Sequence, residues 1–117
     1  MAKTVTLYGI PNCDTVKKAR TWLDSQGVTY TFHDFKKQGL DKSLAAGWLK
    51  ELGPEVLINR KGTTWRKLDE AAQANAGSAA GALALMLAQP SVIKRPVLDR
   101  DGALSAGFTP DTYSKYF

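Results

Sequence analysis

The sequence predicts an α/β fold in which a β-α-β unit, a helical insertion and a β-β-α unit follow one another along 117 residues. Three observations lead to this prediction. The chain opens with a β-branched strand pattern, an amphipathic helix and an alternating strand pattern. Its middle combines alanine-rich stretches with helical apolar spacing. Its end holds two short apolar runs joined by an Asp-Gly turn, which is typical of a β-hairpin, and then a last helix.

The first β-α-β unit occupies residues 4–33. β-branched residues predict a strand over Thr4–Tyr8 that stops at Gly9. Helical spacing of apolar residues predicts a helix over Asp14–Gln26, and Gly27 suits the position just after its end. Alternation predicts a second strand over Thr29–His33, which the helix is long enough to bring parallel to the first. The apolar face of the helix contains Val16, Ala19 and Leu23.

The middle of the chain predicts a helical sub-domain over residues 40–90, inserted into a single domain that spans residues 1–117. A short apolar segment, Glu55–Arg60, runs into a basic turn within it. Proline residues end the first and last helices of this region. The expected helices are Asp41–Leu52, Leu68–Asn75 and Ser78–Gln89.

The C-terminal part predicts a hairpin and a helix. Val92–Asp99 and Ala103–Phe108 are the two apolar runs, and the turn between them contains Asp101-Gly102. Thr109 suits the N-cap of a helix that reaches Phe117, because a proline then occupies the first helical turn.

Composition excludes several classes of protein. The apolar fraction of 44% and the charged fraction of 23% are normal for a globular protein. No apolar run approaches the roughly 20 residues that span a bilayer, so no membrane association is expected. The N-terminus enters the strand pattern without a signal-peptide core, which indicates a cytoplasmic protein. One cysteine cannot form an internal disulfide.

The net charge of +5 comes with basic residues in pairs, among them Lys17 with Lys18 and Lys94 with Arg95. The pairs form no dense stripe with interleaved aromatic residues, so direct nucleic-acid binding is not expected. Two or three converging cations suit an anionic small molecule. The alternative for any one pair is a set of solvated surface charges.

Cys13 stands where the first helix is expected to begin. Unpaired backbone N–H groups and the positive end of the helix dipole favour a thiolate there. The hypothesis is a reactive thiol, and the alternative is a small buried hydrophobic residue. His33, the only histidine, has no Cys or His companion at metal-ligand spacing, so no metal site is expected. Gly77–Gly81 follows no expected strand and matches no phosphate-loop pattern.

Three segments carry a resemblance to a known family. They are Gly9-Ile-Pro-Asn-Cys13-Asp-Thr-Val-Lys-Lys-Ala, Gly62-Thr-Thr-Trp-Arg-Lys-Leu and Ile93-Lys-Arg-Pro-Val. Over essentially its whole length the chain resembles the arsenate reductase (ArsC) family, specifically its YffB branch beside the Spx regulators. The resemblance implies a thioredoxin-like fold with a helical insertion between the second and third strands.

The resemblance also implies a set of site residues. Cys13 matches the nucleophilic cysteine of the family. Arg60 and Arg95 match two of the basic residues that surround the thiolate and the oxyanion in arsenate reductases. Pro96 matches the cis-proline that thioredoxin-like folds place opposite the active-site cysteine.

Two neighbours of these residues are further candidates for the site. Arg66 is a candidate for holding a carboxylate-bearing ligand. Asn12 precedes the cysteine and is expected to cap the helix, with substrate contact as the alternative.

Two positions depart from the relatives of this branch. Leu104 stands where arsenate reductases carry a third arginine, which makes arsenate reduction the lesser alternative. Val16 stands where Spx-type proteins have the second cysteine of Cys-x-x-Cys. A single cysteine must use an outside thiol to resolve its own mixed disulfide, and glutathione is the expected co-substrate.

The sequence therefore predicts a thiol-dependent oxidoreductase with no bound cofactor, in which Cys13 attacks an anionic or oxidised-thiol substrate and glutathione releases the product. One alternative is a genuine arsenate reductase. The other is an Spx-like transcriptional regulator that binds the α subunit of RNA polymerase.

Overall fold

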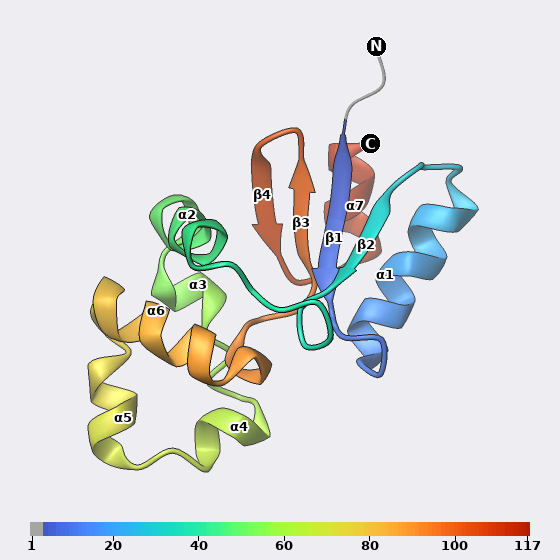
Figure 1. Cartoon of the computed structure of the whole chain (residues 1–117). Coiled ribbons are helices and arrows are strands. Elements are labelled where there is room, and N and C mark those ends of the chain that lie inside the picture. The colour runs from blue at the N-terminus through green and yellow to red at the C-terminus, as the bar shows by residue number, and fades with distance from the viewer. Residues whose placement is uncertain (1–3) are drawn as a thin grey trace. The chain divides into compact units, whose positions relative to one another are not determined.

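The computed structural model describes residues 4–117 and divides the chain into two compact units (Figure 1). The first unit contains the chain up to Gln38 and from Arg95 to Phe117, and the second contains Gly39–Lys94. The first unit is built from β1 (Val5–Gly9), α1 (Asp14–Ser25), β2 (Thr31–Asp34), β3 (Val97–Arg100), β4 (Ala103–Ala106) and α7 (Pro110–Tyr116). The second is built from α2 (Lys42–Leu52), α3 (Pro54–Leu57), α4 (Thr63–Arg66), α5 (Glu70–Asn75), α6 (Ala79–Ala88) and the 3₁₀ turn η1 (Pro90–Val92).

The four strands form one sheet in the order β2-β1-β3-β4. β1 pairs in parallel with β2 and antiparallel with β3, and β3 and β4 form the expected hairpin. The second unit lies in the chain between β2 and β3. The sheet order and the position of the insertion confirm the expected fold class, a thioredoxin-like α/β fold with a helical insertion.

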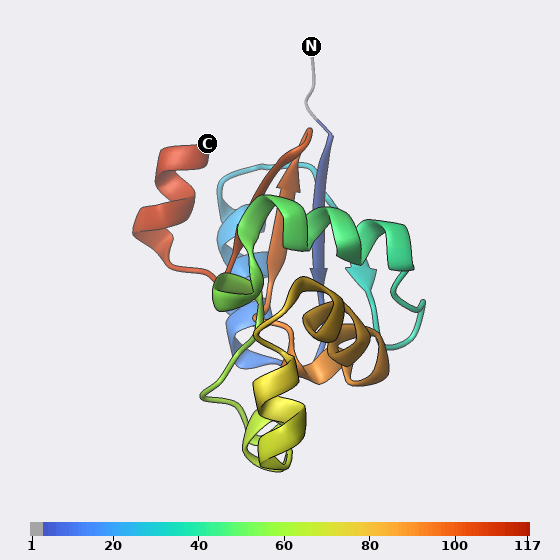
Figure 2. The same cartoon turned by 90° about the vertical axis from the view of Figure 1, so that its left-hand side faces the viewer.

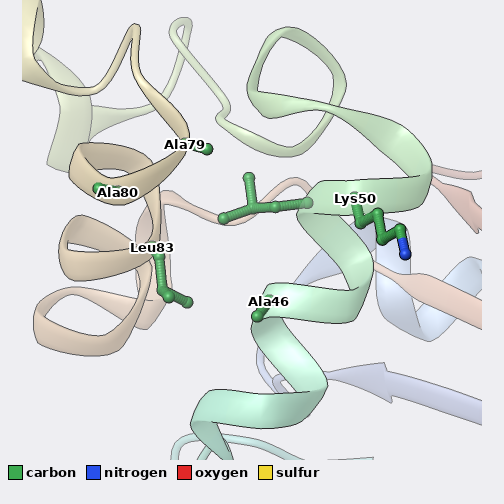
Figure 3. A pocket seen from close by; sticks show the side chains of 6 residues that line it. Ala46, Lys50, Ala79, Ala80 and Leu83 are labelled. Carbon is green, nitrogen blue, oxygen red and sulfur yellow. The ribbon is translucent and has the colours of Figure 1, made fainter.

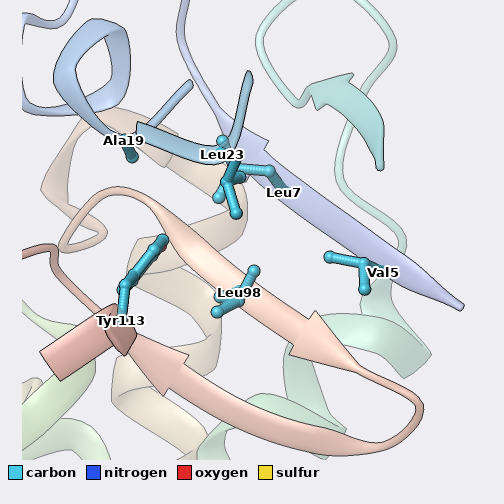
Figure 4. Close-up of a cluster of buried hydrophobic side chains, with 6 residues drawn as sticks. All are labelled: Val5, Leu7, Ala19, Leu23, Leu98 and Tyr113. Carbon is cyan, nitrogen blue, oxygen red and sulfur yellow. The ribbon is translucent and has the colours of Figure 1, made fainter. Parts of the chain in front are cut away.

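One face of the sheet carries the hydrophobic core of the first unit. Leu7 pairs with Phe32 on one side and with Leu98 on the other, so these side chains point to the same face. α1 and α7 lie against this face (Figure 2). Six buried side chains form the centre of the cluster (Figure 4): Val5, Leu7, Ala19, Leu23, Leu98 and Tyr113.

The end of α1 explains why β2 begins two residues later than expected. Gly27 adopts a φ of +70°, which glycine tolerates best. Its N–H donates to the Asp24 carbonyl, and the Val28 N–H donates to the Leu23 carbonyl at 3.0 Å. This pair of bonds is the Schellman motif, and it uses Val28 to end the helix. The prediction of Gly27 was correct, and the strand starts only at Thr31.

Val92–Lys94 also departs from the expected strand run of Val92–Asp99. Val92 ends η1, and Ile93 forms an isolated antiparallel bridge with Ile58 inside the second unit. The bridge is held by the Lys94 N–H, which donates to the Leu57 carbonyl at 2.7 Å. The β3 strand therefore begins only at Val97.

The second unit contains two one-turn helices, α3 and α4, that the sequence pattern did not predict, because four residues are too few to show a helical period. Its longer helices begin where polar side chains cap them. Asp41, Asp69 and Ser78 each accept a hydrogen bond from the backbone N–H three residues later. The Asp69 cap explains why α5 starts at Glu70 and not at Leu68.

Tyr113 yields a stability prediction because it is fully buried and its hydroxyl makes no hydrogen bond with any described residue. An unpaired buried hydroxyl costs about 1–3 kcal/mol, so we expect Tyr113→Phe to raise the free energy of unfolding by about 1 kcal/mol at pH 7 in urea titrations. A variant less stable than the wild type would contradict this reading of the cluster.

The same residue makes the stability depend on alkaline pH. Burial, and then the neighbouring Tyr116, raise the pKa of Tyr113 above its ordinary value of 10.0. As the pH rises, the Tyr113 hydroxyl therefore ionises in the unfolded chain before it ionises in the folded protein. Its contribution to the free energy of unfolding is complete below pH 10 and is lost as the pH rises above 10. Above pH 10 we expect the free energy of unfolding of the Tyr113→Phe variant to fall less steeply with pH than that of the wild type.

Candidate functional site

Cys13 occupies the N-cap position of α1 and is partly exposed. Its backbone is extended, with a φ of −87° and a ψ of 125°. Its N–H donates to the Ile10 carbonyl at 3.1 Å, which closes the turn after β1, and its carbonyl accepts from the Lys17 N–H at 2.9 Å, the first bond of the helix. The thiol is therefore placed by a closed turn on one side and by the helix on the other.

The N-cap slot of α1 lacks a side-chain cap. Four other helices have a capping side chain, as Thr109 shows for α7, whereas the Cys13 side chain accepts no such bond. The expectation that Asn12 caps the helix was wrong, because Cys13 itself is the cap residue and Asn12 precedes it, exposed, in the turn. The first-turn N–H groups of α1 thus have no side-chain acceptor from the N-cap, and they face the thiol end of the helix.

The cis-proline lies at the same end of the sheet as this turn. The Arg95–Pro96 peptide bond is cis, as the resemblance implies, and Pro96 is buried. Tyr8 pairs with Val97 in the antiparallel β1–β3 ladder, so the residues before Val97 lie beside the residues after Tyr8. The chain thus brings Pro96 and the β1–α1 turn that leads to Cys13 to one edge of the first unit.

Hydrogen bonds fix the backbone around this edge. The Pro96 carbonyl accepts from the Gly107 N–H at 2.9 Å, and the Gly9 carbonyl accepts from the Phe35 N–H at 3.2 Å. Arg95, half-buried, immediately precedes the proline. The N-cap cysteine, the start of α1 and the Arg95–Pro96 segment thus lie at the same end of the sheet.

Arg60 and Arg66 belong to the second unit. The Arg60 guanidinium lies over the Trp65 ring, 5.4 Å from its centroid, and Arg66 is the exposed last residue of α4. Arg60 also lines a hollow of about 270 Å³ with two further cations, Lys61 and Lys94. Glu55 also lines this hollow. A cation-rich hollow of this kind can take a carboxylate or another anion.

Sequence reasoning missed a polar group on the sheet face opposite the core. The Tyr8 and His33 rings lie 5.1 Å apart at 52°, as the paired register of β1 and β2 requires. Burial, and then the negative charge of Asp99, raise the pKa of the Tyr8 hydroxyl. The alternation of β1 was the signal available, since it places Tyr8 on the face away from Leu7.

A second hollow lies between α2 and α6 and is almost wholly apolar (Figure 3). Ala46 and Lys50 line it from α2, and Ala79 and Leu83 line it from α6; its volume is about 360 Å³. Lys50 is its one charged side chain, so it offers no catalytic chemistry. Within residues 4–117 no group of three His, Cys, Asp or Glu side chains is placed to hold a metal ion, and no helix is long and apolar enough to cross a membrane.

A thioredoxin-like sheet with one cysteine at the start of α1 and a cis-proline before β3 defines the class of single-cysteine thioredoxin-like proteins. Within that class, the chain belongs to the ArsC family, whose model matches residues 8–116.

Solved structures and curated relatives agree with this placement. A YffB protein is 54% identical, with 96% of this chain and 97% of that chain covered and a TM-score of 0.90. An arsenate reductase (ArsC) related protein from Brucella melitensis is 57% identical, with 97% and 94% covered and a TM-score of 0.79. The global transcriptional regulator Spx from Streptococcus pyogenes is 28% identical over 109 residues, which is 92% of this chain and 80% of Spx.

Proposed function

We propose that the protein is a glutathione-dependent thiol reductase in which Cys13 is the only protein nucleophile. The observation that carries the proposal is the uncapped N-cap cysteine at the same end of the sheet as the cis Arg95–Pro96 bond. Membership of the ArsC family and the likeness to arsenate reductase-related structures support reductase chemistry.

The reaction proceeds by two thiol–disulfide exchanges. The Cys13 thiolate attacks the glutathione sulfur of a glutathionylated substrate, forms a Cys13–glutathione disulfide and expels the substrate thiolate, which takes a proton. The thiolate of a second glutathione, having lost its proton, then attacks the sulfur bound to Cys13. This step frees the Cys13 thiolate and yields glutathione disulfide. The substrate gains two electrons, and two glutathione groups become one disulfide.

The arginines hold the carboxylates of glutathione or of another anionic partner. In the first unit the proposed contacts are Arg95, beside the cis-proline, and Asn12, in the turn before the thiol; Arg60 and Arg66 are the candidate cations of the second unit. Arginine suits this role because its charge is permanent and its fork matches a carboxylate. The chemistry requires reduced glutathione, and we therefore place the protein in the cytoplasm.

The proposal predicts a single covalent adduct. After incubation with glutathione disulfide at neutral pH, we expect the intact mass to rise by one glutathionyl group on Cys13, because its thiol is partly exposed and can exchange with a disulfide. Reduced glutathione should then remove the adduct. Peptide mapping locates the adduct, and Cys13→Ala supplies the control that stays unmodified. An unmodified wild-type protein, or an adduct that glutathione does not remove, would rule the proposal out.

The Spx relationship favours one alternative, a regulator that binds the α subunit of RNA polymerase. Val16, fully buried, takes the place of the second cysteine of the Spx switch, so such binding would not respond to oxidation through a Cys-x-x-Cys pair. Association of the purified protein with the α subunit, with no thiol exchange at Cys13, would favour this alternative.

The family relationship favours a second alternative, arsenate reduction. Leu104, which takes the place of the third arginine, lies in β4 and adds no positive charge. Arsenate-dependent oxidation of glutathione that disappears in Cys13→Ser would establish this activity, and its absence in the wild type would exclude it.

A further inference from the structure

A third hollow lies along α1 in the first unit, between this helix and the segment that leads into α7. Its volume is about 590 Å³. Its lining side chains are Lys17, Lys18, Thr21, Trp22, Ser25, Phe108 and Pro110. The proposed reaction uses none of these residues.

The aromatic walls of the hollow are fixed by the core. Trp22 packs edge-on against Tyr113, with ring centroids 5.7 Å apart, and Phe108 packs edge-on against the same ring, with centroids 4.6 Å apart. Tyr113 itself is fully buried. Trp22 and Phe108 remain partly exposed, so the hollow presents apolar aromatic surface that is already in place before any partner arrives.

The charges at the hollow have one sign. Lys17 and Lys18 are exposed and line it, and none of its lining residues is acidic. Asp14 and Asp24 on α1 and Asp111 on α7 are not among the lining residues. A partner that fills this hollow therefore matches it best with a large apolar side chain flanked by negative charge.

The hollow also starts close to the nucleophile. Lys17 follows Cys13 by four residues and Ser25 by twelve, so the hollow runs from about 6 Å to about 18 Å along the helix axis from the thiol end. An extended peptide segment of about five residues reaches from the thiol end of α1 to the far end of the hollow. The segment in the hollow and the glutathionylated cysteine presented to Cys13 can thus belong to one polypeptide.

From these features we infer that the hollow is a docking site for a protein substrate: a short acidic segment with an aromatic or large aliphatic anchor, adjacent in sequence to the glutathionylated cysteine that Cys13 reduces. The inference rests on the proposed function and names its substrate class as proteins rather than small disulfides. The anchor contacts Trp22 and Phe108, and the acidic side chains face Lys17 and Lys18.

Docking is tested first without chemistry. The probe is the blocked hexapeptide Asp-Glu-Phe-Asp-Leu-Glu, titrated into ¹⁵N-labelled protein at low salt. We expect the largest NMR chemical-shift changes at the Trp22 indole N–H and at the backbone amides of α1 and residues 107–110. The affinity for the peptide should fall as the salt concentration rises. The double variant Lys17→Glu/Lys18→Glu should weaken binding at least tenfold, since two favourable charge contacts become repulsive.

A second double variant with two charge reversals controls for the change in net charge. Lys42→Glu/Lys50→Glu makes the same change in charge on exposed positions of α2, in the second unit, and should leave the peptide affinity within twofold. Thr21→Glu supplies a second test, because it places a carboxylate in the hollow at an exposed helix position and should also weaken binding. Equal losses in both double variants, or shift changes confined to other elements, would overturn the docking site.

Reduction is tested next with a longer peptide that has a glutathionylated cysteine beside the same acidic segment. Its kcat/KM should exceed that of a Gly-Ser control peptide at least tenfold, and Lys17→Glu/Lys18→Glu should remove the difference while leaving reduction of the control peptide unchanged. If both peptides are reduced at the same rate, the docking inference is refuted, whereas the proposed reductase activity is not. If the peptide binds but neither peptide is reduced, the proposed reaction is refuted instead.

Discussion

Replacing Cys13 by serine is expected to abolish disulfide reduction while leaving the fold at least as stable. A hydroxyl cannot form the mixed disulfide on which the proposed reaction depends, so kcat/KM should fall by about 10³-fold or more. Serine is, however, a preferred N-cap residue, and the N-cap slot of α1 has no side-chain cap at present. In α2, α5, α6 and α7 the capping oxygen accepts from the N–H three residues on, which in α1 is that of Val16.

The two effects have opposite signs and separate measurements. Serine at position 13 should raise the free energy of unfolding by about 0.5–1 kcal/mol in urea titrations, because its hydroxyl can accept from the first turn. Cys13→Ala is the matched control, since it removes the nucleophile without supplying an acceptor and should be inactive with no gain in stability. Residual turnover in both variants would show that Cys13 is not the nucleophile.

Short-range patterns predicted most of the first unit. β-branched residues ending at Gly9, helical spacing through Leu23 and the hairpin turn at Gly102 are local signals. β1, α1, β2 and β4 each begin within two residues of their expected start, whereas β3 begins well after Val92. The same patterns placed the cysteine at the start of α1. The resemblance, and not spacing, supplied the cis bond before Pro96.

What the sequence could not provide are features set by residues far apart in the chain. Asn12 was expected to cap α1 because asparagine caps well, but α1 begins at Asp14 as predicted, so Cys13 is the N-cap residue, and its N–H closes a turn with the Ile10 carbonyl. No residue near Tyr8 in the sequence indicates that Asp99 raises the pKa of the Tyr8 hydroxyl, because Asp99 belongs to β3. The hollow along α1 likewise needs Phe108, which lies more than 80 residues after the helix.

Gly81 is a further case, and it carries the second large prediction. It lies in the Gly77–Gly81 stretch, whose composition had no functional explanation, and it is buried in the first turn of α6. A Cβ atom added there would overlap the backbone carbonyl oxygen of Asn75, which belongs to α5, and would lie 2.7 Å from the carbonyl carbon. Both atoms belong to the backbone, so neither can rotate away. The glycine is thus required by the close approach of two helices.

We therefore expect Gly81→Ala to lower the free energy of unfolding by about 2–4 kcal/mol, although alanine is the better helix former. Gly47→Ala is the matched control. Gly47 is also helical, in exposed mid-α2, and an added Cβ there meets nothing within 4 Å. That variant should gain about 0.5–1 kcal/mol from helix propensity alone. Circular dichroism during urea unfolding gives both values. Because the two substitutions are chemically identical, a loss at one glycine and a gain at the other isolates the contact between α6 and the Asn75 carbonyl, and equal gains at both would refute that contact.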